Sequence, residues 1–120
     1  MDITRGDVHF LPVLLPEWAE GGLSDAERDK FVVALRSDSR PYVPVVLAST
    51  NKRESQKVYS YEVDLDPELF GFPEPTLIDC RWVFSLVTIM FTSETYRFTL
   101  DWPTMQRVSA GLINGLQIQV

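Results

Sequence analysis

The chain has 120 residues, of which 45% are hydrophobic and 12% are aromatic. This length suits one domain with one core, and this composition excludes the intrinsically disordered class. The formal net charge of −6 excludes a general nucleic-acid binder, because broad affinity for polyanions requires clustered cations.

Cys80 is the only cysteine and His9 the only histidine. An internal disulfide is therefore impossible, and the soft ligands are too few for a structural zinc site, so we expect no metal and no cofactor. Residues 1–10 lack the basic and apolar regions of a signal peptide, and no apolar run approaches the roughly 20 residues of a membrane helix. We therefore expect a cytoplasmic chain that makes no contact with a membrane.

The N-terminal half alternates apolar segments with polar ones. Residues 6–15 predict a first strand, with Pro12 marking an edge or a bulge. Residues 16–29 contain two glycines and five carboxylates and predict a long loop. Residues 30–36 and 42–49 are short, continuous apolar runs that predict core strands, and residues 50–57 predict a polar loop.

In the second half, residues 58–65 alternate and predict a half-exposed strand, followed by a Pro/Gly-rich connection over 66–75. Residues 76–89 are rich in β-branched and aromatic residues and predict one bent strand or two, and 96–100 a short strand. From Asp101, a good N-cap, the apolar period becomes helical, at Met105, Val108, Leu112 and Leu116.

Gly111 and Gly115 lie four residues apart in this helix. Glycine weakens a helix intrinsically, so the helix is expected to depend on tertiary packing, and the spacing would allow close approach to another backbone. The sequence thus predicts one domain over residues 1–120, a mostly β fold in which an antiparallel β-barrel precedes a C-terminal helix.

Charge is distributed unevenly along the chain. Residues 28–57 carry seven cations and three carboxylates, a net charge of +4, and the rest of the chain carries −10. This asymmetry indicates either a basic face on an acidic body or a chance grouping of solvated charges. Within the basic segment, the apolar run "VVLA" ends at "STNKRE", a dense group of hydroxyl, amide and charged side chains.

The order of these parts resembles the MazF/PemK family of bacterial toxins, over roughly residues 5–116. The similarity rests on the strand "RGDVHF", the segment "KFVVALRSD", the strand end "VVLASTNKR", the strand "TLIDCRWVFSL" and the closing helix "LDWPTMQRVSAGLINGL". The resemblance implies a small SH3-like barrel of the PemK/CcdB type that forms a homodimer and binds a cognate antitoxin. It also implies an endoribonuclease activity that needs no metal.

In such a reaction the substrate's own 2′-OH attacks the adjacent phosphate, so the protein supplies a base, an acid and positive donors to the phosphate. By the resemblance, Thr50 matches the family's catalytic Thr, and Lys30 falls where the family has its catalytic Arg. Lysine is a point charge without the planar fork of Arg. Arg81 falls where some members carry an acidic residue, and Asp79 lies two positions upstream on the same face of an ideal strand.

The expected contacts to single-stranded RNA come from residues near these positions. Trp18 lies among carboxylates and glycines, where a core role is not expected, and so predicts contact with a partner, a base or the other half of a dimer. The cations and amide of the basic segment are expected to reach the phosphate backbone; they are Arg28, Asn51, Lys52 and Arg53.

Structural roles compete with each of these assignments. Thr50 could cap a turn, Lys30 could be a solvated charge, and Arg81 could stack on a ring or pair with Asp79. His9 titrates near neutrality and is a candidate base, but its alternation with Val8 and Phe10 predicts an exposed strand position without a role. Cys80 in an apolar strand predicts a core residue.

The function predicted from the sequence is therefore the toxin of a type II toxin–antitoxin system, cleaving single-stranded RNA. Two rivals remain open. One is a catalytically inactive protein-binding module of the same fold, as in related toxins that poison a topoisomerase, and the other is an unrelated β-barrel adaptor. The divergent positions Lys30 and Arg81 favour the first rival.

Overall fold

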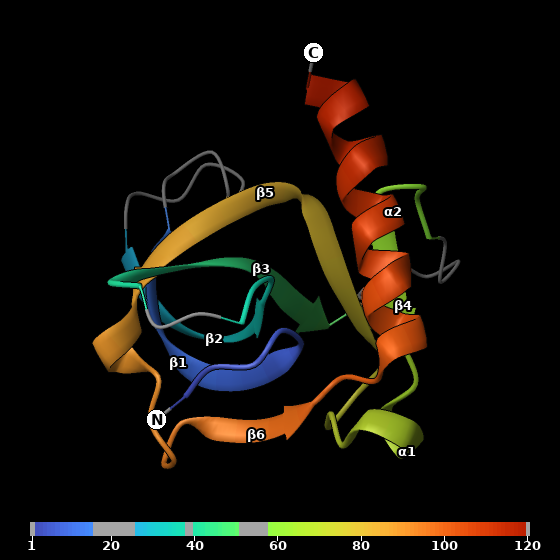
Figure 1. Cartoon of the computed structure of the whole chain (residues 1–120). Coiled ribbons are helices and arrows are strands. Elements are labelled where there is room, and N and C mark those ends of the chain that lie inside the picture. The colour runs from blue at the N-terminus through green and yellow to red at the C-terminus, as the bar shows by residue number, and fades with distance from the viewer. Residues whose placement is uncertain (1, 16–25, 38–39, 51–57, 120) are drawn as a thin grey trace.

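The computed structural model describes residues 2–15, 26–37, 40–50 and 58–119 (Figure 1). Six strands form one antiparallel sheet in the order β4-β5-β3-β2-β1-β6. The strands are β1 (Asp7–Leu15), β2 (Ala26–Ala34), β3 (Tyr42–Thr50), β4 (Glu62–Leu65), β5 (Thr76–Val87) and β6 (Tyr96–Thr99). Two short helices, α1 (Pro67–Phe70) and the 3-10 turn η2 (Thr88–Met90), flank β5, and α2 (Trp102–Gln119) ends the chain. The sheet curls into a half-barrel with α2 at one side, as predicted.

The central strands are buried on both faces, which explains their continuous apolar runs. Val33 and Val46 belong to one core cluster, which packs against α2 through Met105 and Val108. The alternate residues of the same strands, such as Val32 and Val45, form a second cluster on the other face of the sheet. Because both faces of β2 and β3 are buried, these strands do not show an alternation of polar and apolar residues.

Strand β5 is a single strand with a sharp bend, one of the two predicted arrangements (Figure 1). Its register against β3 shifts between the pairs Leu47↔Asp79 and Val45↔Phe84. Because β3 advances two residues over this interval and β5 advances five, β5 bulges between Asp79 and Phe84. The bulge lies where α2 crosses the strand.

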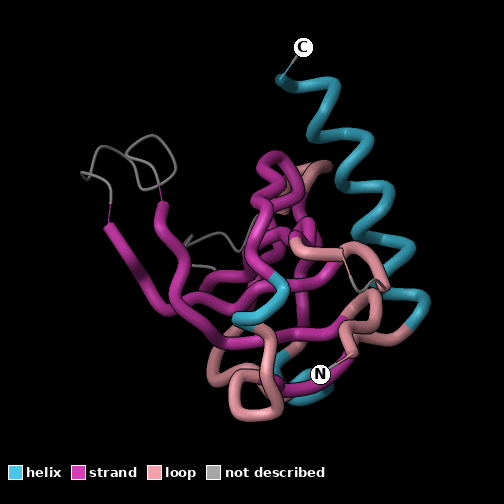
Figure 2. Tube along the Cα trace, turned by 60° about the vertical axis from the view of Figure 1, so that its left-hand side comes forward, coloured by secondary structure: helices cyan, strands magenta, loops and turns pink. Residues whose placement is uncertain are grey.

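Helix α2 begins as predicted and extends beyond the sheet. The Asp101 side chain accepts a hydrogen bond from the Thr104 amide at 2.8 Å, as an N-cap does. Met105 and Val108 are buried, and Leu112 packs on the first core cluster, but the expected core position of Leu116 is wrong, since it is 62% exposed. Figure 2 shows the reason, because the C-terminal end of α2 runs past the sheet it packs on.

Two strand boundaries differ from the prediction. Strand β2 begins at Ala26, inside the predicted loop, because residues 26–29, three of them charged, pair with β1 as far as Leu15. Strand β4 begins only at Glu62, because residues 59–62 form a turn in which the Glu62 amide donates to the Tyr59 carbonyl at 2.9 Å. In both places, pairing and turn geometry override the local sequence pattern.

His9 is buried, so its expected exposed position is wrong. The ring packs edge-on against Phe91 and Tyr96, with centroids 4.8 and 5.6 Å away. Its Nδ1 lies 2.8 Å from the Thr95 hydroxyl, while its Nε2 has no hydrogen-bond partner. The curvature of the sheet brings η2 and β6 over the face that the sequence pattern assigns to solvent.

Candidate functional site

Lys30 and Thr50 lie at the same end of two neighbouring strands. The register of β2 and β3 runs from Ala34↔Val45 to Phe31↔Ala48, so Lys30 lies one residue and Thr50 two residues beyond the last pair. Thr50 ends β3 and pairs through its main chain with Thr76 of β5. Continuing the register by one residue places the exposed Ser49 opposite Lys30. The same register places Thr50 opposite Asp29, so Lys30 and Thr50 are diagonal main-chain neighbours at one end of the strand pair and hold positions of opposite faces.

Asp79 and Arg81 form a bidentate ion pair at the bend of β5. The Arg81 Nη2 donates to Asp79 Oδ2 at 2.9 Å, and Nε donates to Oδ1 at 3.2 Å. The Arg81 amide also donates to Oδ1, at 3.0 Å. The hydrogen bonds to the Asp79 carboxylate raise the pKa of Arg81 above its ordinary value, although partial burial of the guanidinium acts in the opposite direction. Both side chains remain about one-third exposed, at 33% and 29%, so the pair is accessible from solvent.

Lys30 and Asp79 lie on the same face of the sheet. Val32 pairs with Leu47, and Leu47 pairs with Asp79, so these three positions share a face. Lys30 precedes Val32 by two residues and therefore lies on that face too. Two strand spacings separate β2 from β5, so the two positions are on the order of 10 Å apart across the sheet. This face thus carries the Lys30 ammonium and, two strands away, the Asp79–Arg81 pair.

The predicted RNA-contacting residues fall largely outside the described part of the chain. Trp18, Asn51, Lys52 and Arg53 lie outside the described residues. The main chain of Arg28 is described, and it pairs with Val13 in the β1–β2 ladder. Arg28 is therefore two residues from Lys30 on the same strand.

Two tyrosines beside Arg81 were not identified from the sequence. The Arg81 guanidinium carbon lies 4.4 Å from the ring centroid of Tyr61, and the Tyr59 ring stacks on Tyr61 with a centroid distance of 5.6 Å. The ring of Trp82 is 5.8 Å from the same guanidinium. The alternating pattern assigned both tyrosines to one side of a strand, and only the turn at 59–62 reveals the stack.

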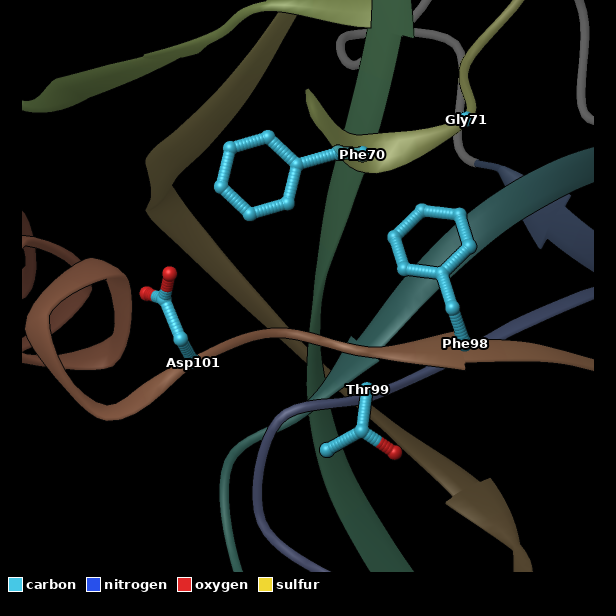
Figure 3. A pocket seen from close by; sticks show the side chains of 5 residues that line it. All are labelled: Phe70, Gly71, Phe98, Thr99 and Asp101. Carbon is cyan, nitrogen blue, oxygen red and sulfur yellow. The ribbon is translucent and has the colours of Figure 1, made fainter. Parts of the chain in front are cut away.

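Two hollows in the described residues lie away from Lys30. Phe70 of α1 and Phe98 of β6 face a hollow of about 400 Å³, with Asp101 at its side (Figure 3). A second hollow of about 230 Å³ adjoins Thr76, the partner of Thr50, and carries the carboxylates of Asp64 and Asp66. Carboxylates repel a phosphate, so neither hollow offers the anion site that phosphate chemistry requires.

His9 and Cys80 are unsuited to catalysis because both side chains are buried. Burial lowers the pKa of His9, against the opposing effect of the Asp7 carboxylate. His9 pairs with Val32 in the β1–β2 ladder and so shares the face of Lys30, but its side chain is fully buried. Burial raises the pKa of Cys80 to about 12, so its thiol is not a nucleophile near neutrality. The core assignment of Cys80 is confirmed.

The described residues form neither a metal-binding cluster nor a membrane-spanning helix. Over residues 2–15, 26–37, 40–50 and 58–119, no group of three or more His, Cys, Asp or Glu side chains could hold a metal ion. No helix in the described part of the chain is both long enough and apolar enough to cross a membrane.

Comparison with solved structures identifies the fold. An endoribonuclease from a mycobacterial species is 14% identical, with a TM-score of 0.65 over 96% of this chain and 91% of that one. A mycobacterial endoribonuclease in complex with its cognate antitoxin is 15% identical, with a TM-score of 0.66 over 97% and 96%. Mycobacterium tuberculosis toxin MazF-mt6 is 13% identical, with a TM-score of 0.65 over 92% and 96%.

No protein-family model matches the sequence, and neither does any curated protein. The likeness therefore rests on structure and extends over nearly the whole of each chain. The chain has the fold of MazF-type endoribonuclease toxins.

Proposed function

We propose that this chain is the toxin of a type II toxin–antitoxin system and a metal-independent endoribonuclease that cleaves single-stranded RNA. The observation that carries the proposal is the position of Lys30 and Thr50 at one end of β2 and β3, in a chain with the fold of a MazF toxin. The strand pair brings these two positions to one end of the sheet, and there we place the phosphate, because its in-line attack requires a cation and a hydroxyl donor.

The proposed reaction is attack of the substrate's 2′-OH on the adjacent phosphorus, with departure of the 5′-oxygen. Thr50 donates its hydroxyl to a phosphate oxygen, and the Lys30 ammonium stabilises the charge that builds up on the phosphorane. Arg81 supplies a second cation on the same face. Because both oxygens of Asp79 accept hydrogen bonds from Arg81, the task we assign to Asp79 is to orient that guanidinium.

The proposed assembly is a cytoplasmic homodimer restrained by an antitoxin protein. The second half of β5 and the turn after it expose apolar side chains, with Val83, Val87 and Ile89 at 52%, 43% and 82% exposure. A second copy of the chain would remove this apolar surface from water. Arg28, Trp18, Asn51, Lys52 and Arg53 are the proposed contacts to RNA outside the catalytic set.

The experiment is incubation of the purified chain with a long, structure-poor RNA in the presence of EDTA. We expect discrete cleavage by the wild type and a loss of about 10²–10³-fold in rate in Thr50→Ala and in Lys30→Ala, the usual effect of removing one transition-state donor. Ser49→Ala is the matched control, because it removes a neighbouring hydroxyl from the same strand end. Circular dichroism and gel filtration check that each variant is folded.

A catalytically inactive protein-binding module is the second candidate function. The observation that favours it is the closed Asp79–Arg81 ion pair, which engages the guanidinium through two side-chain hydrogen bonds. Intact RNA with every folded variant and with the wild type would exclude the endoribonuclease and leave this candidate. A further possibility, an unrelated adaptor, loses its basis because the fold is that of the toxins.

A further inference from the structure

Three flat groups lie in a row at the corner between β4, β5 and α2. The Arg81 guanidinium lies over the Tyr61 ring at 4.4 Å, and the Tyr59 ring is nearly parallel to that of Tyr61, with an interplanar angle of 11°. The ion pair with Asp79 fixes the guanidinium in its plane at one end of the row. Tyr59 is at the other end and is 39% exposed.

The main chain beneath the row is held by hydrogen bonds from three directions. The Glu62 carboxylate accepts from the Tyr59 amide at 2.9 Å, and the Glu62 amide donates back to the Tyr59 carbonyl. The Cys80 amide donates to the Tyr61 carbonyl at 3.0 Å. From α2, the Asn114 side chain donates to the Ser60 carbonyl at 2.9 Å. The two rings are therefore preorganised, and a ligand that stacks on them would not have to bear the cost of ordering them.

The charges around the row favour a flat, neutral partner over a phosphate. Arg81 is neutralised by Asp79, and the Glu62 carboxylate, which accepts from the Tyr59 amide, lies beside the row and would repel a phosphate. An aromatic ring stacks on tyrosine irrespective of hydrogen-bonding pattern, because every nucleobase has a π-face. The row thus has the shape and the charge of a platform for a nucleobase.

We infer that Tyr59 and Tyr61, anchored by Arg81, form a stacking platform that binds an unpaired base of the RNA substrate. This inference rests on the proposed function, since it names a binding site for the same substrate. The platform lies in the turn before β4, hydrogen-bonded to the strand that carries Asp79, and it adds affinity by stacking, independently of the phosphate contacts made from β2 and β3. It is a binding site, and its residues take no part in the chemical step.

The test measures binding of a fluorescein-labelled, single-stranded 2′-O-methyl oligonucleotide pool by fluorescence anisotropy. This probe has no free 2′-OH, so it cannot be cleaved by the proposed reaction. We expect Tyr59→Ala to raise Kd by about fivefold to about 150-fold, which corresponds to a stacking energy of about 1–3 kcal/mol per base. Tyr59→Phe retains the ring and is expected to bind like the wild type. The dependence of log Kd on log salt is expected to stay unchanged in Tyr59→Ala, because stacking releases no counterions.

Tyr42→Ala is the matched control, because Tyr42 is 60% exposed on β3, where it pairs with Val87 far from the row. Wild-type affinity in Tyr59→Ala would overturn the platform and leave the proposed function standing. Equal weakening in Tyr59→Ala and Tyr59→Phe, or in Tyr42→Ala, would overturn stacking as the cause. Absence of binding and of cleavage by the wild type would overturn the proposed function and the platform with it.

Discussion

A Cβ atom placed on Gly115 would lie 2.7 Å from the carbonyl oxygen of Cys80 and 3.0 Å from the Cα of Arg81. Helix α2 therefore rests directly on the main chain of β5, at the bulge that carries Asp79 and Arg81. At Gly111, one turn earlier, the same Cβ would meet the Cys80 sulfur at 3.0 Å and the Tyr61 carbonyl oxygen at 3.3 Å. Two glycines four residues apart thus fit the helix against the strand that carries one half of the candidate site.

Gly115→Ala is expected to destabilise the protein in spite of alanine's better helix propensity. Alanine gains about 1 kcal/mol as a helix former, but the contact with main-chain atoms forces α2 away from β5, which costs about 1–3 kcal/mol or more. We expect a net loss of about 1–2 kcal/mol in the free energy of unfolding, measured by urea denaturation. Gln106→Ala on the exposed face of α2 is the control, expected to change stability by less than about 0.5 kcal/mol. A Gly115→Ala variant more stable than wild type would contradict the close packing.

The glycine spacing and the bend of β5 could be predicted because each depends on few residues. Gly111 and Gly115 mark a close approach by their lack of a side chain, and the apolar length of 76–89 exceeds that of an ordinary flat strand. The pairing of Arg81 with Asp79 was one of the sequence-based alternatives, since residues that are two positions apart on a strand lie on the same face. The alternation of polar and apolar residues did not predict the turn at 59–62. This turn depends on the Glu62 side chain and on Asn114, which is more than 50 residues away in the sequence.

His9 illustrates the other limit of sequence reasoning. Alternation along β1 assigned it correctly to the face opposite Val8, but on this sheet both faces are covered. Whether the second face is exposed depends on how η2 and β6 return over the sheet, and no local pattern around His9 carries that information. The same limit applies to the candidate site, because Lys30 and Asp79 share a face only through the registers of three strands.

The stability of the protein is expected to fall in mild acid because of His9. Burial lowers its folded-state pKa, and although the Asp7 carboxylate opposes this, Arg97 adds to the lowering. As pH falls below about 6.5, the unfolded chain binds a proton at His9 before the folded chain does, so the unfolded state gains stability. The loss is complete once pH falls below the folded-state pKa, where both states are protonated. Urea denaturation at a series of pH values between 7.5 and about 5 measures it.

His9→Asn is the matched variant for this experiment, because an amide near the Nδ1 position keeps a partner for Thr95 and does not titrate. We expect it to be less stable than wild type at pH 7.5, by about 1–3 kcal/mol for the lost ring packing, but to show a flatter pH dependence above pH 5. The same slope in both proteins would assign the acid sensitivity to carboxylates instead.

Asp79→Asn distinguishes an orienting carboxylate from a proton-transfer group. The amide keeps at most one acceptor for Arg81, so we expect cleavage to slow by about tenfold or more as the guanidinium loses its fixed plane. If Asp79 were a general base, its removal would instead abolish the acidic limb of the pH–rate profile. We therefore expect kcat to fall while the position of that limb stays unchanged. Disappearance of the limb in Asp79→Asn would assign proton transfer to Asp79.

Substitutions of Lys30 test whether its positive charge contacts the phosphate of the RNA. A cation that contacts a phosphate contributes about 0.7 to the slope of log Kd against log salt for a single-stranded nucleic acid. We expect Lys30→Ala to lower that slope by about this amount, and Lys30→Arg to keep it, because the charge is the same. Arginine also offers a planar fork that can hold two phosphate oxygens, so Lys30→Arg should cleave RNA at least as fast as wild type. Anisotropy titrations at several salt concentrations and cleavage rates with EDTA measure the two effects separately. An unchanged slope in Lys30→Ala, with the variant folded, would remove Lys30 from the phosphate-binding residues.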